Sequence, residues 1–132
     1  MLYESLGILK YIEKPLLKVI LELDQEIVNY YRNLISKHLY VKRQYYNAHI
    51  SVIRNQIPLN MYNWNKYNGE NIKFYYSNVI NNDDIYYWIN AYSIRLEDIR
   101  TELGLDNINI FDGEMHFGFN KRFHITIGNT KC

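Results

Sequence analysis

Apolar and polar residues alternate most regularly near the end of the chain, over residues 123–128. A period of two is typical of a β-strand that buries one of its faces. The phenylalanine and the isoleucines of this stretch would point inward, while Arg122, His124 and Thr126 would point outward. The pattern therefore predicts a strand that carries an imidazole and a hydroxyl side by side on its polar face.

The same alternation occurs in the first half of the chain, over residues 45–54. His49 and Ser51 would share one face of this second strand with Tyr45 and Asn47, and the apolar residues between them would face the core. One histidine on the polar face of a strand is usually just solvated. Two copies of a histidine followed two positions later by a hydroxyl residue are a stronger indication of a shared site.

Upstream of the first motif, the pattern predicts two strands and a helix. A strand expected within residues 3–12, around residues 6–9, is ended by Pro15, because proline fixes φ and has no N–H to donate. Residues 16–23 fit a second strand, although they also fit the start of a helical stripe with Pro15 in its first turn. We favour a strand followed by a helix over residues 24–38, because Asp24 is a good N-cap residue.

Residues 85–103 are ambiguous, because their apolar positions also match one long helix. The first part, residues 85–92, is aromatic and β-branched, which favours a strand. We therefore expect a strand and then a helix over residues 94–103, with Ser93 as its N-cap and Gly104 just past its end. The other elements expected in this half are a loop at 55–66, a turn at 68–69, a strand at 72–76, a polar turn at 81–84 and an irregular segment at 105–120 that turns at 112–113.

The size of the chain, 132 residues and 16.0 kDa, is that of a single domain spanning residues 1–132. Its formal net charge is only +1. Proteins that hold long nucleic acids usually present a basic face, because they neutralise many phosphates. We therefore expect a small substrate, of a few nucleotides at most, and no long duplex nucleic acid as a partner.

Cysteine usage and hydropathy bear on the compartment. The single cysteine, Cys132, excludes an intrachain disulfide, so nothing requires an oxidising compartment. No stretch has the features of a signal peptide, and no apolar run approaches the length that spans a membrane. The sequence predicts a cytoplasmic protein that does not bind membranes, located in the host cytoplasm if the chain is viral.

The two histidine motifs resemble the paired His-x-Ser/Thr strands of the 2H phosphoesterase superfamily. Within it, the chain is similar to the phage branch called Swiss Army Knife RNA-repair-like proteins. Ser51 stands where many members carry threonine, which keeps the hydroxyl. The resemblance implies an α+β, two-lobed fold with antiparallel strands lining a concave cleft and helices packed outside. The stretches that carry it are residues 48–54, 64–74, 86–88, 96–100, 102–105 and 123–131.

Two histidines can divide acid–base chemistry, one acting as a base while the other, protonated, acts as an acid. The hydroxyls of Ser51 and Thr126 could donate to the non-bridging oxygens of a phosphate. The resemblance implies that these hydroxyls, with His49 and His124, face one another across the cleft as catalytic residues. No metal or cofactor is expected, because the histidines lack accompanying cysteines or paired carboxylates at ligand spacing.

Other residues are candidates for contacts with the substrate. Arg122 could hold a phosphate, since it shares the strand face of the second motif. Asn47 and Tyr45 share the face of the first motif. Aromatic residues elsewhere could stack on nucleobases, although each of them fits a place in the core equally well. These aromatic candidates are Tyr11, Trp64 and Trp88.

The function expected from the resemblance is a metal-independent phosphodiesterase, a hydrolase acting on RNA-type phosphodiesters. Its candidate substrates are 2′,3′-cyclic phosphate ends, short oligonucleotides and cyclic oligonucleotide messengers. The biological roles implied are RNA repair and viral counter-defence, since related phage enzymes degrade the messengers of CBASS defence. Two alternatives stay open: a non-catalytic protein that sequesters a nucleotide, and an interaction protein whose strand histidines are incidental.

Overall fold

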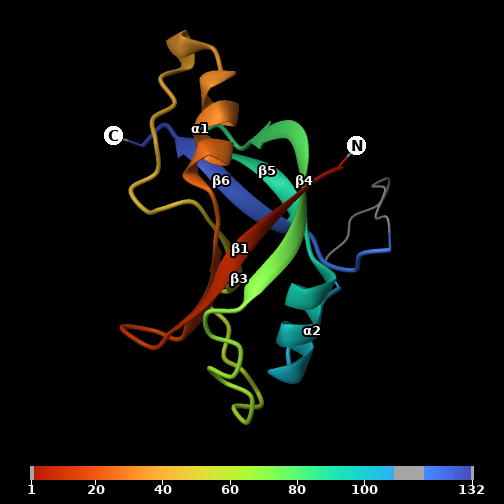
Figure 1. The fold of residues 1–132 in the computed structure, drawn as a ribbon. Coiled ribbons are helices and arrows are strands. Elements are labelled where there is room, and N and C mark those ends of the chain that lie inside the picture. Colours follow the sequence, from red (N-terminus) through yellow and green to blue (C-terminus); the bar gives the residue numbers. More distant parts are fainter. Residues whose placement is uncertain (1, 109–117, 132) are drawn as a thin grey trace.

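The computed structural model describes residues 2–108 and 118–131. Its strands form one closed antiparallel barrel in the order β1-β2-β3-β6-β5-β4 (Figure 1). Two short α-helices and one 3-10 turn complete the described part of the chain. The elements are β1 (Leu2–Ile12), β2 (Lys18–Glu22), α1 (Gln25–Asn33), η1 (Lys37–Leu39), β3 (His49–Ile53), β4 (Asn71–Asn82), β5 (Tyr86–Tyr92), α2 (Ile94–Glu102) and β6 (Phe123–Asn129).

The barrel shows that the expected two-lobed α+β fold is wrong. β3 and β6, the strands of the two histidine motifs, pair directly with each other instead of belonging to separate lobes. β4 pairs with β1 near its start and with β5 near its end, which closes the sheet on itself. A register shift between Tyr76 and Ile80 bends β4 between these two partners. A single closed sheet therefore replaces the cleft between lobes.

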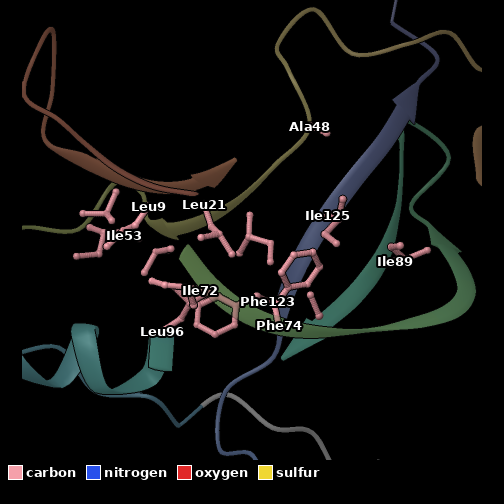
Figure 2. Close-up of a cluster of buried hydrophobic side chains, with 14 of the residues drawn as sticks. Leu9, Leu21, Ala48, Ile53, Ile72, Phe74, Ile89, Leu96, Phe123 and Ile125 are labelled. Carbon is pink, nitrogen blue, oxygen red and sulfur yellow. The ribbon is translucent and has the colours of Figure 1, made fainter. Parts of the chain in front are cut away.

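The interior of the barrel is filled by apolar side chains that alternate with outward-facing residues along each strand. Figure 2 shows side chains from several strands converging on this core, among them Leu9, Leu21 and Ile125, each fully buried. α1 lies against β6, and α2 lies near the opposite end of the barrel beside β4 (Figure 1). Burial of this apolar surface is the main stabilising contribution to the fold.

The helix boundaries confirm the caps expected from the sequence. The side chain of Asp24 accepts a hydrogen bond from Glu26 N (2.9 Å) at the start of α1. Ser93 Oγ accepts from Leu96 N (3.3 Å) at the start of α2. Gly104 follows α2 with φ of 82°, a conformation that glycine adopts without strain. Strand and then helix is thus the correct interpretation of residues 85–103.

The helix expected over residues 24–38 is wrong in its second half, because α1 ends at Asn33. His38 lies instead in the short turn η1, exposed, with Nδ1 2.7 Å from Ser36 Oγ. Tyr40 follows with φ of 56°, so the backbone turns away from a helical path. The side chain of Ser36 and the left-handed backbone of Tyr40 thus replace the hydrogen bonds that a continued helix would make.

Strands β1, β3 and β4 match the lengths expected from the sequence to different degrees. β1 fills the whole of the expected segment 3–12, and β4 is longer than the expected residues 72–76, because neighbouring strands of the closed barrel hydrogen-bond both along most of their length. The strand expected at 45–54 begins only at His49. The turn expected at 112–113 lies outside the described residues. In the described part of the chain, neither helix is long and apolar enough to cross a membrane.

Candidate functional site

The two histidine motifs lie side by side in the wall of the barrel. Ile50 of β3 and Ile125 of β6 are partners in the antiparallel pairing, and both side chains are fully buried. Because side chains alternate along a strand, the residues before and after each isoleucine point to the outer surface. Those residues are the histidines and hydroxyl residues of the two motifs.

The antiparallel register pairs each histidine with the hydroxyl residue of the other motif. Continuing the pairing by one residue on either side sets His49 opposite Thr126 and Ser51 opposite His124. Opposite residues have Cβ atoms about 5 Å apart, and diagonal neighbours, as the two histidines are, about 7–8 Å apart. At that separation, one phosphate group between the two rings can contact both of them. We call these four residues the motif tetrad.

The ring of His49 is oriented by a backbone contact. Its Nδ1 lies 2.7 Å from the carbonyl oxygen of Asn47. A carbonyl only accepts hydrogen bonds, so Nδ1 carries the proton of this bond. In the neutral ring Nε2 is then unprotonated and can accept a proton. Asn47 thus bears on the site through its main chain, whereas the sequence had suggested its side chain.

A carboxylate lies beside the tetrad on the other side of β3. Glu22 of β2 is the Cα partner of His49, and both residues are partly exposed. Its carboxylate forms an ion pair with Lys10 of β1. The outer surface around His49 therefore contains a positive and a negative charge that offset each other.

His124 is exposed and packs against an aromatic ring from the neighbouring strand. The ring centroids of His124 and Trp88 are 5.3 Å apart, and the ring planes are inclined by 38°. Trp88 lies on β5, where its Cα partner is Thr126. The structure therefore brings this sequence-predicted aromatic residue to the tetrad. Cations are attracted to the face of an indole, so Trp88 is a suitable neighbour for an imidazolium.

Asn90 is a neighbour of the site that the sequence analysis missed. It is the Cα partner of His124 on β5 and has the same outward parity as Trp88. Its Oδ1 is buried, and no described residue hydrogen-bonds it. Applying strand parity to residues 86–92, as was done for the motif strands, would have identified it.

Two aromatic candidates are not brought to the tetrad. Tyr11 has the inward parity of Leu9 on β1, and its ring packs edge-on against Trp64 with centroids 5.1 Å apart. Trp64 Nε1 donates to Glu13 Oε1 (3.1 Å), which fixes the loop that carries it. Burial raises the pKa of Tyr11 to about 12. These two rings pack at the edge of the core, which fits the core alternative, and their role in base stacking stays a prediction.

Arg122 and Tyr45 lie close to the motif strands in the sequence but outside the residues that pair in the sheet. Arg122 directly precedes β6 and is partly buried. Tyr45 belongs to an excursion of the chain before β3, where its side chain is 91% exposed. The ring of Tyr46 lies edge-on against it, with centroids 5.3 Å apart.

Arg100 anchors β3 to α2, a role that the sequence analysis did not identify. Its side chain is only 2% exposed. The guanidinium donates to the carbonyl oxygens of Val52 (2.8 Å) and Asp106 (2.8 Å) and to Gln56 Oε1 (2.8 Å). Burial lowers the pKa of Arg100 from its usual value. Because Val52 follows Ser51 directly, this network fixes the strand of the first motif.

Glu97, one turn earlier on α2, holds the segment that leads into β6. Glu97 is 5% exposed, and its carboxylate accepts from Asn120 N (3.0 Å) and Asn120 Nδ2 (3.2 Å). Lys121 N donates to the same carboxylate at 3.4 Å. One face of α2 thus contacts both motif strands or their flanks. The sequence did offer a signal for both residues, because Glu97 and Arg100 lie among the apolar residues of the expected helix. It was missed because charged residues on a helix are usually solvated.

A cavity of about 700 Å³ lies away from the tetrad, between the start of α2, β1 and β4. Its lining is mainly apolar, and its basic residues are already paired: Lys73 with Glu4 (3.8 Å) and Arg95 with Glu70 (2.8 Å). The described residues that line it include no histidine and one carboxylate, that of Asp98. The tetrad is therefore the better candidate for a reactive site.

Comparison of the chain with protein-family models, with curated proteins and with solved structures found no match.

Proposed function

We propose that the protein is a metal-independent phosphodiesterase that acts on RNA-type phosphodiesters, with His49 as the base and His124 as the acid. The observation that supports this is the pairing of β3 with β6, which gives both motifs one outer face. The proposal takes the two-histidine chemistry from the resemblance to 2H phosphoesterases and leaves their two-lobed fold aside. RNA repair and viral counter-defence are the roles it would serve.

The proposed reaction uses each tetrad residue once. Nε2 of His49 removes the proton from the attacking hydroxyl, either a ribose 2′-hydroxyl or water. The new P–O bond forms as the bond to the leaving oxygen breaks, and the imidazolium of His124 gives its proton to that oxygen. The hydroxyls of Ser51 and Thr126 donate hydrogen bonds to the non-bridging oxygens, where negative charge develops.

Different contacts suit the two histidines to these roles. The bond from His49 Nδ1 to the Asn47 carbonyl leaves Nε2 as the basic nitrogen. The indole of Trp88 is a suitable neighbour for His124 in its cationic form. Such a division requires no metal, because the imidazolium and the hydroxyls supply the positive charge and the hydrogen bonds.

The test is a turnover assay in EDTA with three substrate types: 2′,3′-cyclic mononucleotides, dinucleoside monophosphates, and cyclic di- and trinucleotides. We expect product in molar excess over protein for at least one type. His49→Ala and His124→Ala should each lower it by about 10²–10⁴-fold, whereas His38→Ala, at an exposed histidine in η1, should behave as the wild type.

Two outcomes would contradict the proposal. Tight binding without turnover would instead indicate a protein that sequesters its nucleotide. Loss of activity in EDTA, restored by zinc or manganese, would mean that the histidines act as metal ligands rather than as acid and base.

A further inference from the structure

A loop leaves the sheet of the barrel beside the tetrad. Lys42 forms an isolated bridge with Asn129, and Ile50 pairs with Ile125 farther along the same strand. Seven residues on one side therefore face three on the other, so part of the chain must leave the wall. Residues 43–47 form this excursion, which we call the tyrosine loop.

Both ends of the tyrosine loop are fixed. At its start, a Cβ atom on Gly128 would lie 2.6 Å from Val41 Cγ1 and 2.8 Å from Lys42 O, so the close packing there requires glycine. At its end, Ala48 N donates to Gln25 Oε1 (3.0 Å). These two contacts fix both ends of the tyrosine loop and hold it next to His49.

The tip of the loop presents two tyrosines to solvent on the β2 side of the tetrad. Tyr45 is 91% exposed and Tyr46 is 67% exposed. Lys18 Nζ lies 5.9 Å from the centroid of the Tyr46 ring. Lys18 points outward from the start of β2, because the next residue, Val19, is fully buried. Since β2 borders β3 on the side away from β6, the tyrosines flank the tetrad there.

Trp88 flanks the tetrad from the opposite side. It lies on the outer face of β5, the strand that borders β6 away from β3. In Figure 1 the chain between η1 and β3 bows out on one side of the barrel, while β5 lies on the other side of β6. Two aromatic platforms thus stand on either side of the groups that would act on the phosphate.

Resting on the proposed function, we infer that the substrate is an RNA-type phosphodiester with a nucleobase on each side of the scissile phosphate. One base stacks on Trp88, which is partly exposed, and the other on the exposed rings of the tyrosine loop, since aromatic rings at the surface are platforms for bases of any sequence. β2 and β5 are three strand spacings apart, roughly 14 Å. Stacked neighbouring bases are only about 3.4 Å apart. The two bases must therefore be splayed, as in an unpaired strand or a small cyclic oligonucleotide.

The experiment compares kcat/KM for the dinucleotide ApA, for the two analogues of ApA that each lack one base, and for 2′,3′-cyclic AMP. The wild type should prefer ApA to each of the one-base compounds by roughly 5- to 150-fold, the range that corresponds to one stacked base. Trp88→Ala and the double variant Tyr45→Ala/Tyr46→Ala should each lower kcat/KM for ApA by a similar factor. Tyr62→Ala, at an exposed tyrosine in the loop before β4, is the matched control and should change nothing.

The one-base analogues show which base of ApA stacks on Trp88 and which stacks on the tyrosine loop. The effect of the tyrosine double variant should vanish on one analogue, and the effect of Trp88→Ala should shrink on the other to the part that comes from its contact with His124. If the wild type cleaves 2′,3′-cyclic AMP or a one-base analogue as efficiently as ApA, or if neither aromatic variant affects ApA, the two-base inference is wrong while the phosphodiesterase proposal stands.

Binding separates the two-base site from catalysis. In the His49→Ala background, calorimetric titration with ApA should still detect binding, which Trp88→Ala and the tyrosine double variant should each weaken. If the wild type binds ApA in this way but turns over no substrate, the phosphodiesterase proposal fails and the two-base site is supported. If ApA neither binds nor reacts, the inference fails as well.

Discussion

The indole of Trp88 covers one side of the His124 ring, at a centroid distance of 5.3 Å. His49, on the adjacent strand, is held through Nδ1 by the carbonyl oxygen of Asn47 instead. Two histidines that sequence alone treats as equivalent therefore stand in different surroundings. This difference is the basis for assigning them different roles.

Replacing either histidine should remove activity and leave the barrel folded. We expect His49→Ala and His124→Ala each to lower kcat for ApA by about 10²–10⁴-fold, the usual contribution of one general acid or base. Both side chains project from the outer face, where substitutions usually change stability by about 0.5 kcal/mol or less. Circular dichroism and urea unfolding check the fold, and loss of structure in both variants would make these residues structural.

The two hydroxyls should matter less than the histidines but in the same steps. Ser51→Ala and Thr126→Val should each lower kcat by about 10²–10³-fold, the typical cost of one donor to a developing oxyanion. Ser51→Thr keeps the hydroxyl and should retain most of the activity. Equal loss in Ser51→Ala and Ser51→Thr would show that packing, rather than hydrogen bonding, explains the effect.

The pH dependence of activity should assign base and acid separately. The proposed mechanism requires a neutral His49 and a protonated His124, so the wild-type profile should rise with pH and then fall. The residual activity of His49→Ala should lose the acid limb, and that of His124→Ala should lose the alkaline limb. The opposite pattern would exchange the two roles.

Arg100 should be the most sensitive position on α2. Arg100→Ala leaves the carbonyl oxygens of Val52 and Asp106 buried without their donor, and we expect a loss of about 3–5 kcal/mol in the free energy of unfolding. Arg54, exposed at the end of β3, provides the control, since Arg54→Ala should cost about 0.5 kcal/mol or less. Similar urea midpoints for the two variants would show that the buried network contributes little.

Asp83 should add stability that disappears in acid. The backbone N–H groups of Tyr86 (2.7 Å) and Ile85 (3.1 Å) donate to its carboxylate and hold the pKa of Asp83 below its usual value of 3.8. A lowered folded-state pKa stabilises the protein above pH 3.8, and this contribution is lost as the pH falls through the folded-state value.

The test is thermal unfolding of Asp83→Asn as a function of pH. Its deficit relative to the wild type should be largest near neutral pH and shrink toward about pH 2. Asp84→Asn is the matched control: Asp84 has φ of 75°, which asparagine also tolerates. A deficit for Asp83→Asn that does not change with pH would rule out a role for the carboxylate charge.

Local features of the fold could be predicted from the sequence because short-range physics determines them. Alternation assigned the inward and outward faces of β3 and β6, and the caps at Asp24 and Ser93 located the starts of both helices. These predictions depend only on side-chain periodicity and on the need of the first helical N–H groups for acceptors.

The barrel itself could not be predicted in this way, because it depends on which distant strands pair. Whether β3 and β6 share a sheet is decided by the register of Ile50 with Ile125, and closure is decided by β1 against β4. The tyrosine loop has the same origin, since it exists only because Lys42 also pairs with β6. The buried role of Arg100 depends on acceptors from loops whose paths the sequence does not specify.

α2 spans the seam where the two motif strands meet. Arg100 holds the β3 side and Glu97 holds the segment entering β6, while the pairing between these strands is the shortest in the barrel. The helix acts as a brace, so the separation of the two imidazoles is set from a distance by side chains that touch neither ring. Substitutions in this helix could therefore change the separation of the two imidazoles while the motif tetrad itself stays the same.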